Sequence, residues 1–191
     1  MRNILLVLLL FTALLQAEVE IKRSYYDNGK VKHVRQYMNG KLEGLSSSFY
    51  PTGELKINAK FHRGILWGTT FAYYKNTRLK AEMPYRKGKL DGQIKEYFAN
   101  GQLRTAQQFD MGVPVANKRV YYWDGNMKAR INFDDNGKMD GMAKEYYPGG
   151  MLRQSIMFRN GKALYGWNYS EGGSRKKMTN EDFKKMGLQV Q

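Results

Sequence analysis

Six basic residues lie at intervals of 24 or 25 positions along this chain. A regular row of positive charges of this kind could bind an extended anion. The six residues are Lys32, Lys56, Lys80, Arg104, Lys128 and Arg153. Lysine and arginine stay positive at neutral pH, so a regular row of them attracts polyanions. The whole chain shares this bias, since 32 Lys+Arg stand against 17 Asp+Glu in 191 residues, a formal net charge of +15.

An aromatic doublet recurs at the same interval. The six doublets are Tyr25-Tyr26, Phe49-Tyr50, Tyr73-Tyr74, Tyr97-Phe98, Tyr121-Tyr122 and Tyr146-Tyr147. Self-similarity at a fixed interval of this length is typical of repeat architectures, which present the same side chains again and again along a surface. The pattern therefore favours a binding surface over a catalytic pocket.

Residues that could perform catalysis are few. His33 and His62 are the only histidines and occupy non-equivalent positions in their repeats, so we expect His33 to be packed rather than a ligand. Ser46-Ser47-Ser48 lies in a predicted strand without a glycine-framed nucleophile turn. The chain has no cysteine, which excludes thiol catalysis and thiolate metal sites. We predict no enzymatic activity, no cofactor and no metal.

Alternating strands position these residues. Leu55, Ile57, Ala59 and Phe61 alternate with polar residues, the two-residue period of a half-buried strand. Matching stretches lie at 31–37, 79–85, 103–109, 127–133 and 152–158. Turn dipeptides such as Asn28-Gly29 separate each doublet from its strand. The sequence therefore predicts an all-β fold, an elongated antiparallel meander of repeated β-hairpins with about 24 residues per repeat.

The turn length decides which rings face the cations. With a two-residue turn, Tyr50 lies opposite Leu55 and Phe49 opposite Lys56. The second ring of each doublet then joins the apolar face, and the first ring lies across from the cation on the polar face. The candidate binding rings are accordingly Tyr25, Phe49, Tyr73, Tyr97, Tyr121 and Tyr146. A three-residue bulged turn would exchange these assignments.

Two interpretations of the basic face stay open. Lysine and arginine on a solvent face keep a long sheet soluble and discourage edge pairing. The same row, with rings beside it, could bind an extended anionic partner, a carbohydrate or a lipid headgroup surface.

The two ends of the chain differ from the repeats. Residues 1–17 have an apolar run after Arg2 and end in Leu15-Gln16-Ala17, the pattern of a signal peptide cleaved after Ala17; an uncleaved anchor is the alternative. The repeat domain is expected at 18–170. Residues 171–191 are expected to be a basic linker and a short capping helix, which Thr179 and Asp182 cap and which covers the edge of the last strand.

The unit Tyr-Tyr-x-Asn-Gly-x-Leu-Lys, followed by an aromatic and Gly-Lys-Leu-x-Gly, resembles the MORN-variant repeat, which in bacterial chains often carries the label of YwqK-like antitoxin component. The copy from Tyr25 to Gly44 fits throughout, and the resemblance extends to Gly166. It implies elongated antiparallel β structure and the binding of lipid or protein. It brings no catalytic residues.

These observations predict an exported binding or scaffold protein, periplasmic or secreted. The first expected partner is an anionic lipid or envelope polymer. The alternative is a protein partner, including antitoxin-like neutralisation. Nucleic acid is not expected, because an exported protein seldom meets it, and cleavage after Ala17 would leave no stable transmembrane span.

Overall fold

The computed structural model describes residues 18–190, which form one sheet and one short helix. The expected signal peptide lies outside these residues. The strands are β1 Val19–Tyr25, β2 Val31–Met38, β3 Lys41–Phe49, β4 Leu55–His62, β5 Ile65–Leu66, β6 Gly68–Tyr73, β7 Leu79–Arg86, β8 Lys89–Leu90, β9 Gly92–Tyr97, β10 Leu103–Asp110, β11 Val113–Tyr121, β12 Met127–Phe133, β13 Gly141–Tyr146, β14 Leu152–Arg159, β15 Lys162–Tyr169 and β16 Arg175–Lys177. The helix α1 spans Asn180–Lys185.

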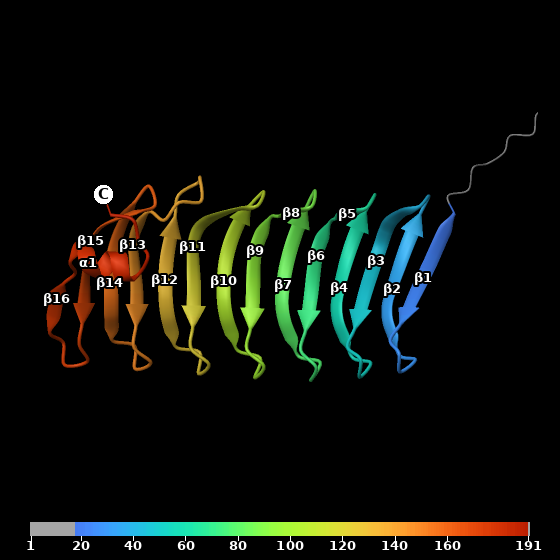
Figure 1. The fold of residues 1–191 in the computed structure, drawn as a ribbon, viewed down its shortest axis with the longest axis horizontal. Coiled ribbons are helices and arrows are strands. Elements are labelled where there is room, and N and C mark those ends of the chain that lie inside the picture. The colour runs from blue at the N-terminus through green and yellow to red at the C-terminus, as the bar shows by residue number, and fades with distance from the viewer. Residues whose placement is uncertain (1–17, 191) are drawn as a thin grey trace, which may run out of the picture.

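The strands follow one another across the sheet in chain order, from β1 to β16, each antiparallel to its neighbour. The two short strands β5 and β8 lie off this path and pair with β4 and β7. Figure 1 shows the result, a long single-layered ribbon with turns along both sides. The predicted all-β meander of hairpins with a C-terminal helix is confirmed.

Two-residue turns close five of the hairpins along the upper side of the ribbon in Figure 1, whereas the turn between β12 and β13 has three residues, since the Asp134 N–H donates to the Lys138 carbonyl at 2.9 Å. Asn39 and Gly40 both have positive φ, +49° and +74°, the combination that type I′ turns need to match the twist of the strands. A second glycine follows four residues after the turn glycine, as at Gly40 and Gly44, and Gly44 has φ +78°. In the fourth copy, Ala116 takes this role with φ +58°, so the chain keeps the local path without a glycine there.

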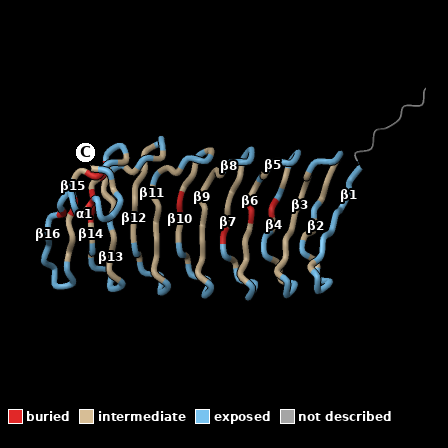
Figure 2. The backbone as a smooth tube through the Cα atoms, viewed as in Figure 1, coloured by how far each residue is buried: buried red, intermediate tan, exposed pale blue. Residues whose placement is uncertain are grey.

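Burial is uneven along the ribbon (Figure 2). A single layer covers its own faces poorly, so the middle strands bury small residues such as Ala59, Ala81 and Ala106 and leave most others half-exposed. The one core cluster of the described residues lies at the C-terminal end and consists of Ile156, Phe158, Ala163, Met178 and Phe183.

The C-terminal segment makes this core by folding over a face of the sheet. Thr179 and Asp182 form the predicted capping box of α1. The expectation that the helix covers the last edge is wrong, because Phe183 packs on Ile156 and Phe158 of β14 instead. The edge of β15 pairs instead with β16, formed by the basic segment expected to be a linker, and with Val190, which bridges to Ala163 after α1. No helix in the described part of the chain has the length and apolarity to cross a bilayer.

Candidate functional site

A three-residue turn follows each aromatic doublet and fixes the geometry of the basic row. In the second copy, the Tyr50 N–H donates to the Glu54 carbonyl and the Gly53 N–H donates to the Tyr50 carbonyl, both at 2.8 Å. Gly53 has φ +106°, as a type I turn closed by a left-handed residue requires. The other five doublets are followed by turns with the same bonds, and in the third copy Thr77 takes the left-handed conformation, φ +63°.

A β-bulge follows from this turn length. Phe49 pairs with Leu55 and Ser48 pairs with Ile57, so Lys56 is the extra residue of β4. The same shift occurs at the other doublets, for example between Ala72 and Tyr73. The prediction that each cation lies across from a first-position ring is therefore wrong. It assumed a two-residue turn, which would have had no bulge.

The bulge places the cations on the rings of the second position. We call this side of the sheet the ladder face and define it by the second-position rings Tyr26, Tyr50, Tyr74, Phe98, Tyr122 and Tyr147. The cation-to-centroid distances are 5.5 Å for Lys32 on Tyr26, 5.6 Å for Lys56 on Tyr50, 5.6 Å for Lys80 on Tyr74, 5.5 Å for Lys128 on Tyr122 and 5.8 Å for Arg153 on Tyr147. These are cation–π distances, and successive cations stand two strands apart, ~9.5 Å.

Four of these cations keep their charge available. Within residues 18–190, no carboxylate forms a salt bridge with Lys32, Lys56, Lys80 or Lys128. Arg153, in contrast, lies 3.2 Å from Glu145. The unpaired lysines are therefore the positions on the ladder face where an incoming anion would meet uncompensated positive charge.

The fourth copy departs from the pattern. Its second ring is Phe98, and the Arg104 guanidinium donates to the Glu96 carboxylate at 2.7 Å rather than stacking on that ring. Thr105 donates to the same carboxylate at 2.9 Å. Burial acts to raise the pKa of Glu96, but the hydrogen bonds from Arg104 and Thr105 outweigh it and hold the pKa below its usual value. Arg104 is thus largely neutralised.

The second-position tyrosines also join neighbouring repeats. Each hydroxyl donates to the backbone carbonyl of a residue 22 to 24 positions later in the chain: Tyr26 to Phe49 at 2.7 Å, Tyr50 to Tyr73 at 2.8 Å, Tyr74 to Tyr97 at 2.7 Å, Tyr122 to Tyr146 at 2.7 Å and Tyr147 to Tyr169 at 2.9 Å. We call these bonds the tyrosine links. Phe98 has no hydroxyl and cannot make one. Sequence reasoning missed the links, although the choice of tyrosine over phenylalanine at five of six second positions was the available signal.

The first-position rings lie on the opposite face. The Tyr97 hydroxyl donates to Glu82 at 2.7 Å. Burial, this hydrogen bond and the negative charge of Glu82 raise the pKa of Tyr97 to about 12. Tyr25 at the N-terminal end is 57% exposed. The structure therefore separates the two sets that the sequence analysis combined, placing the cations on one face and Tyr25, Phe49, Tyr73, Tyr97, Tyr121 and Tyr146 on the other.

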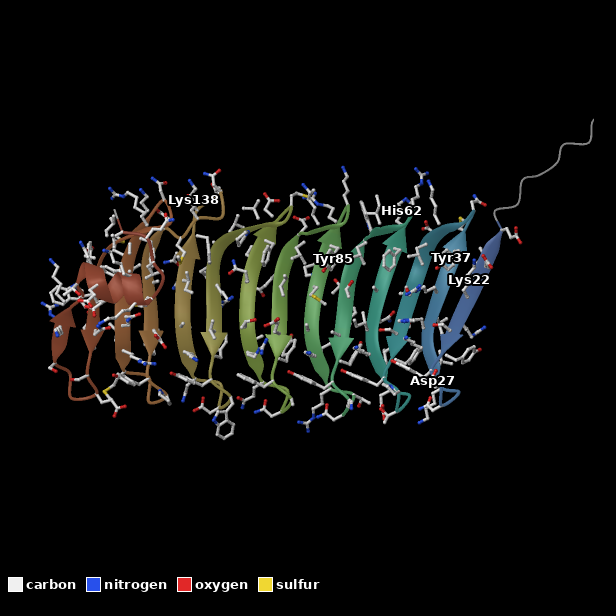
Figure 3. The ribbon with its side chains drawn as sticks, viewed as in Figure 1. Lys22, Asp27, Tyr37, His62, Tyr85 and Lys138 are labelled. Atoms are coloured by element: carbon white, nitrogen blue, oxygen red, sulfur yellow. The ribbon has the colours of Figure 1, made fainter. Side chains whose placement is uncertain are left out.

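Candidate catalytic groups do not converge. His33 is half-buried and faces Ser24 and Ser48 across the sheet; burial, with Arg35, Lys32 and Lys56 nearby, lowers its pKa. His62 lies near the two-residue turns, where its Nδ1 is 3.0 Å from Glu43 (Figure 3). Glu43 also accepts the Arg63 N–H at 2.7 Å, so it stabilises a strained turn of the next repeat. In the described residues, no group of three or more His, Asp or Glu could hold a metal ion.

Two shallow grooves lie on the ladder face. One, of about 200 Å³, adjoins α1 and is lined by apolar side chains that include Ile131, Met139 and Met186. The other lies over the middle strands and has mixed lining, from Ile94 and Phe109 to Glu96 and Lys118. Both grooves offer apolar surface beside charged residues, and in the second the Glu96 carboxylate is held by Arg104 and Thr105.

Taken together, an open single-layered sheet with one repeated surface defines a β-hairpin repeat protein. Four segments, residues 21–39, 42–62, 90–110 and 139–160, match the family model described as MORN repeat variant. These segments are similar to MORN-variant repeats, and that similarity suggests a binding or scaffold module in general terms. No curated protein matches the chain.

The matched segments do not include two of the hairpin regions. Residues 63–89 contain Thr77 in place of the turn glycine, and residues 111–138 contain Ala116 in place of the second glycine of the pair. Both regions nevertheless form the same antiparallel hairpins, β6 with β7 and β11 with β12. The repeat architecture therefore extends beyond the copies that keep the sequence pattern.

Proposed function

We propose that this protein binds an extended anionic partner of the cell envelope, a lipid surface or an acidic polymer, through the ladder face. The observation that carries the proposal is the row of unpaired lysines, Lys32, Lys56, Lys80 and Lys128, each held on a tyrosine ring. The ring lies beside the ammonium group of each lysine, and each of the four lysines is exposed to solvent. Lys32, Lys56 and Lys80 stand ~9.5 Å apart, and Lys128 follows after a gap at Arg104, which Glu96 neutralises. A row of this kind suits a partner that repeats its own charges.

The proposal includes export and the absence of enzymatic activity. Support for export comes from the pattern of residues 1–17, and support for a non-catalytic role comes from the scattered positions of His33, His62 and the serines. Mass spectrometry of the chain purified from cells that express the complete sequence tests export directly. We expect an N-terminus at Glu18; a chain that retains residues 1–17 would contradict cleavage after Ala17.

Binding is tested by removing charge from one face at a time. The ladder-face variant carries Lys56→Gln, Lys80→Gln and Lys128→Gln. A matched control carries Lys60→Gln, Lys95→Gln and Lys144→Gln, three lysines that the strand pairing places on the opposite face. Both variants lose three positive charges, so a nonspecific effect of net charge would weaken both equally.

The readout is co-sedimentation with vesicles that contain an anionic lipid and, separately, with isolated wall polymer. We expect the ladder-face variant to lose at least about tenfold in affinity and the control to lose much less, with added salt weakening the wild type. Equal losses in the two variants, or binding that salt does not change, would overturn the proposal.

A protein partner is the second candidate, and the apolar groove beside α1 favours it. The groove lies between the sheet and the helix, where Met139, Ile156 and Met186 offer adaptable apolar contacts. Antitoxin-like neutralisation of a protein would use such a groove. Met139→Glu should then abolish capture of one stoichiometric protein from the envelope fraction, while the ladder-face variant should still capture it. Capture unaffected by Met139→Glu would contradict this candidate.

A further inference from the structure

The two edges of the sheet are built differently. The N-terminal edge is β1, seven residues long, with every residue exposed. The C-terminal edge consists of β16, three residues long and all basic (Arg175, Lys176 and Lys177), and of Val190, which bridges to Ala163 of β15. A long exposed edge strand is a template for pairing with another strand, whereas a short and highly charged one discourages it. Figure 1 shows β1 at the end of the ribbon farthest from α1.

The backbone groups of β1 that face outward can be identified from its pairing with β2. The Glu18 carbonyl accepts a hydrogen bond from the Asn39 N–H at 3.4 Å, which places this residue's backbone groups toward β2. The direction alternates along an antiparallel strand, so Glu20 and Lys22 also face β2. The N–H and C=O groups of Val19, Ile21 and Arg23 therefore point to the free edge.

We propose that β1 pairs with β1 of a second copy of this chain, antiparallel and centred on Ile21. In this register, Ile21 faces Ile21 of the second copy, and Val19 faces Arg23. Three pairs, with two main-chain hydrogen bonds each, then use the outward-facing groups identified above. Between them, Glu20 of each copy faces Lys22 of the other, so the register is complementary in charge.

Charge disfavours the alternative arrangements. A register centred on Lys22 would place Lys22 directly opposite Lys22 of the second copy. Head-to-tail pairing of β1 with β16 would bring Lys22 and Arg23 against three basic residues and would produce an open chain of copies. The Ile21-centred pair avoids both the Lys22–Lys22 contact and the open chain of copies, because it forms a closed dimer of two copies.

The dimer would extend the ladder face. Glu20 and Lys22 project from the same side of β1, where they already lie 3.2 Å apart and Lys22 stacks on the Tyr37 ring at 5.1 Å (Figure 3). The two-fold axis of an antiparallel strand pair is perpendicular to the sheet, so the ladder faces of both copies would lie on one side. Their rows of cations would form one surface of twice the length.

Sedimentation equilibrium of the chain purified from cells that express the complete sequence tests the proposal. We expect a reversible dimer in the micromolar range. Ile21→Pro removes an outward N–H without removing a bond to β2, so it should give a folded monomer with an unchanged circular dichroism spectrum. Ile21→Val keeps the N–H and should remain dimeric. A wild-type chain that stays monomeric up to ~100 μM, or a dimer that survives Ile21→Pro, overturns the proposal.

The charge pairs give a second test that does not depend on proline. Lys22→Glu alone, or Glu20→Lys alone, places like charges opposite each other at two sites and should weaken self-association at least about tenfold. An equimolar mixture of the two variants restores both opposite-charge pairs and should form the heterodimer. Failure of the mixture to associate more strongly than either variant alone would contradict the Ile21-centred register.

Discussion

Among residues 18–190, the C-terminal end of the ribbon has a core and the N-terminal end has none. At the C-terminal end, Phe183 is 2% exposed and packs with Ile156 and Phe158 under α1. At the N-terminal end, all seven residues of β1 are exposed. Between these ends, the repeats are held by strand pairing, small buried residues and the tyrosine links. The comparison shows that a single-layered sheet can be ordered by repeated local contacts, and that a core is added where the sheet ends.

The largest expected effect comes from shifting the repeat by half a unit. Deleting residues 67–78, twelve residues, removes one strand and forces everything after it to turn over, so the ladder face of the remaining repeats would lie on the wrong side. We expect loss of the folded state by circular dichroism.

Deleting a whole number of repeats is the matched control. Removal of residues 67–114, forty-eight residues, joins Leu66 to Val115 in the same phase and should leave a folded protein. Equal loss of structure in both deletions would contradict the repeat account.

Removing the centre of the C-terminal core should be the next largest effect. Phe183→Ala leaves a cavity under α1 and should cost about 3–5 kcal/mol in the stability of this region. Leu45→Ala near the other end should cost under ~1 kcal/mol, since Leu45 is 57% exposed. Native-state hydrogen exchange measures both. Similar losses of protection in the two variants would contradict the contrast between the ends.

The tyrosine links should contribute less per bond. Tyr74→Phe removes the bond to the Tyr97 carbonyl and should cost about 0.5–1.5 kcal/mol. Phe98→Tyr offers the Tyr121 carbonyl the bond that the fourth copy lacks and should stabilise by a similar amount. Urea unfolding measures both changes, and a destabilising Phe98→Tyr would show that the fourth copy cannot accommodate the link.

The smallest expected effect is the pH dependence of the Glu96 site. The folded state lowers the pKa of Glu96 below the unfolded value near 4.5. Between the two pKa values the unfolded chain binds more protons, so this contribution is present above pH 4.5 and is lost as the pH falls through the folded pKa. Because the pair is partly exposed, it contributes under about 1 kcal/mol. The difference in free energy of unfolding between wild type and Glu96→Gln should shrink on acidification. A difference that grows would contradict the lowered pKa of Glu96.

The sequence predicts the repeat, the strands and the capping box because each depends on local periodicity or on neighbouring residues. The sequence did not predict the bulge, because Thr52-Gly53 fits a two-residue or a three-residue turn. With three residues, Lys56 and Leu55 exchange faces of the sheet. Sequence reasoning also missed the tyrosine links and the core under α1. Both depend on contacts between residues at least 20 positions apart, which periodicity does not specify.

The most direct test of this account is the position of the cations relative to the two rings of a doublet. Nuclear Overhauser contacts in solution should connect the side chain of Lys80 with the ring of Tyr74, and Tyr74→Leu should remove the upfield ring-current shift of the Lys80 methylenes while Tyr73→Leu leaves it. Contacts from Lys80 to Tyr73 instead would place the basic row on the other face and contradict the bulged geometry on which the ladder face depends.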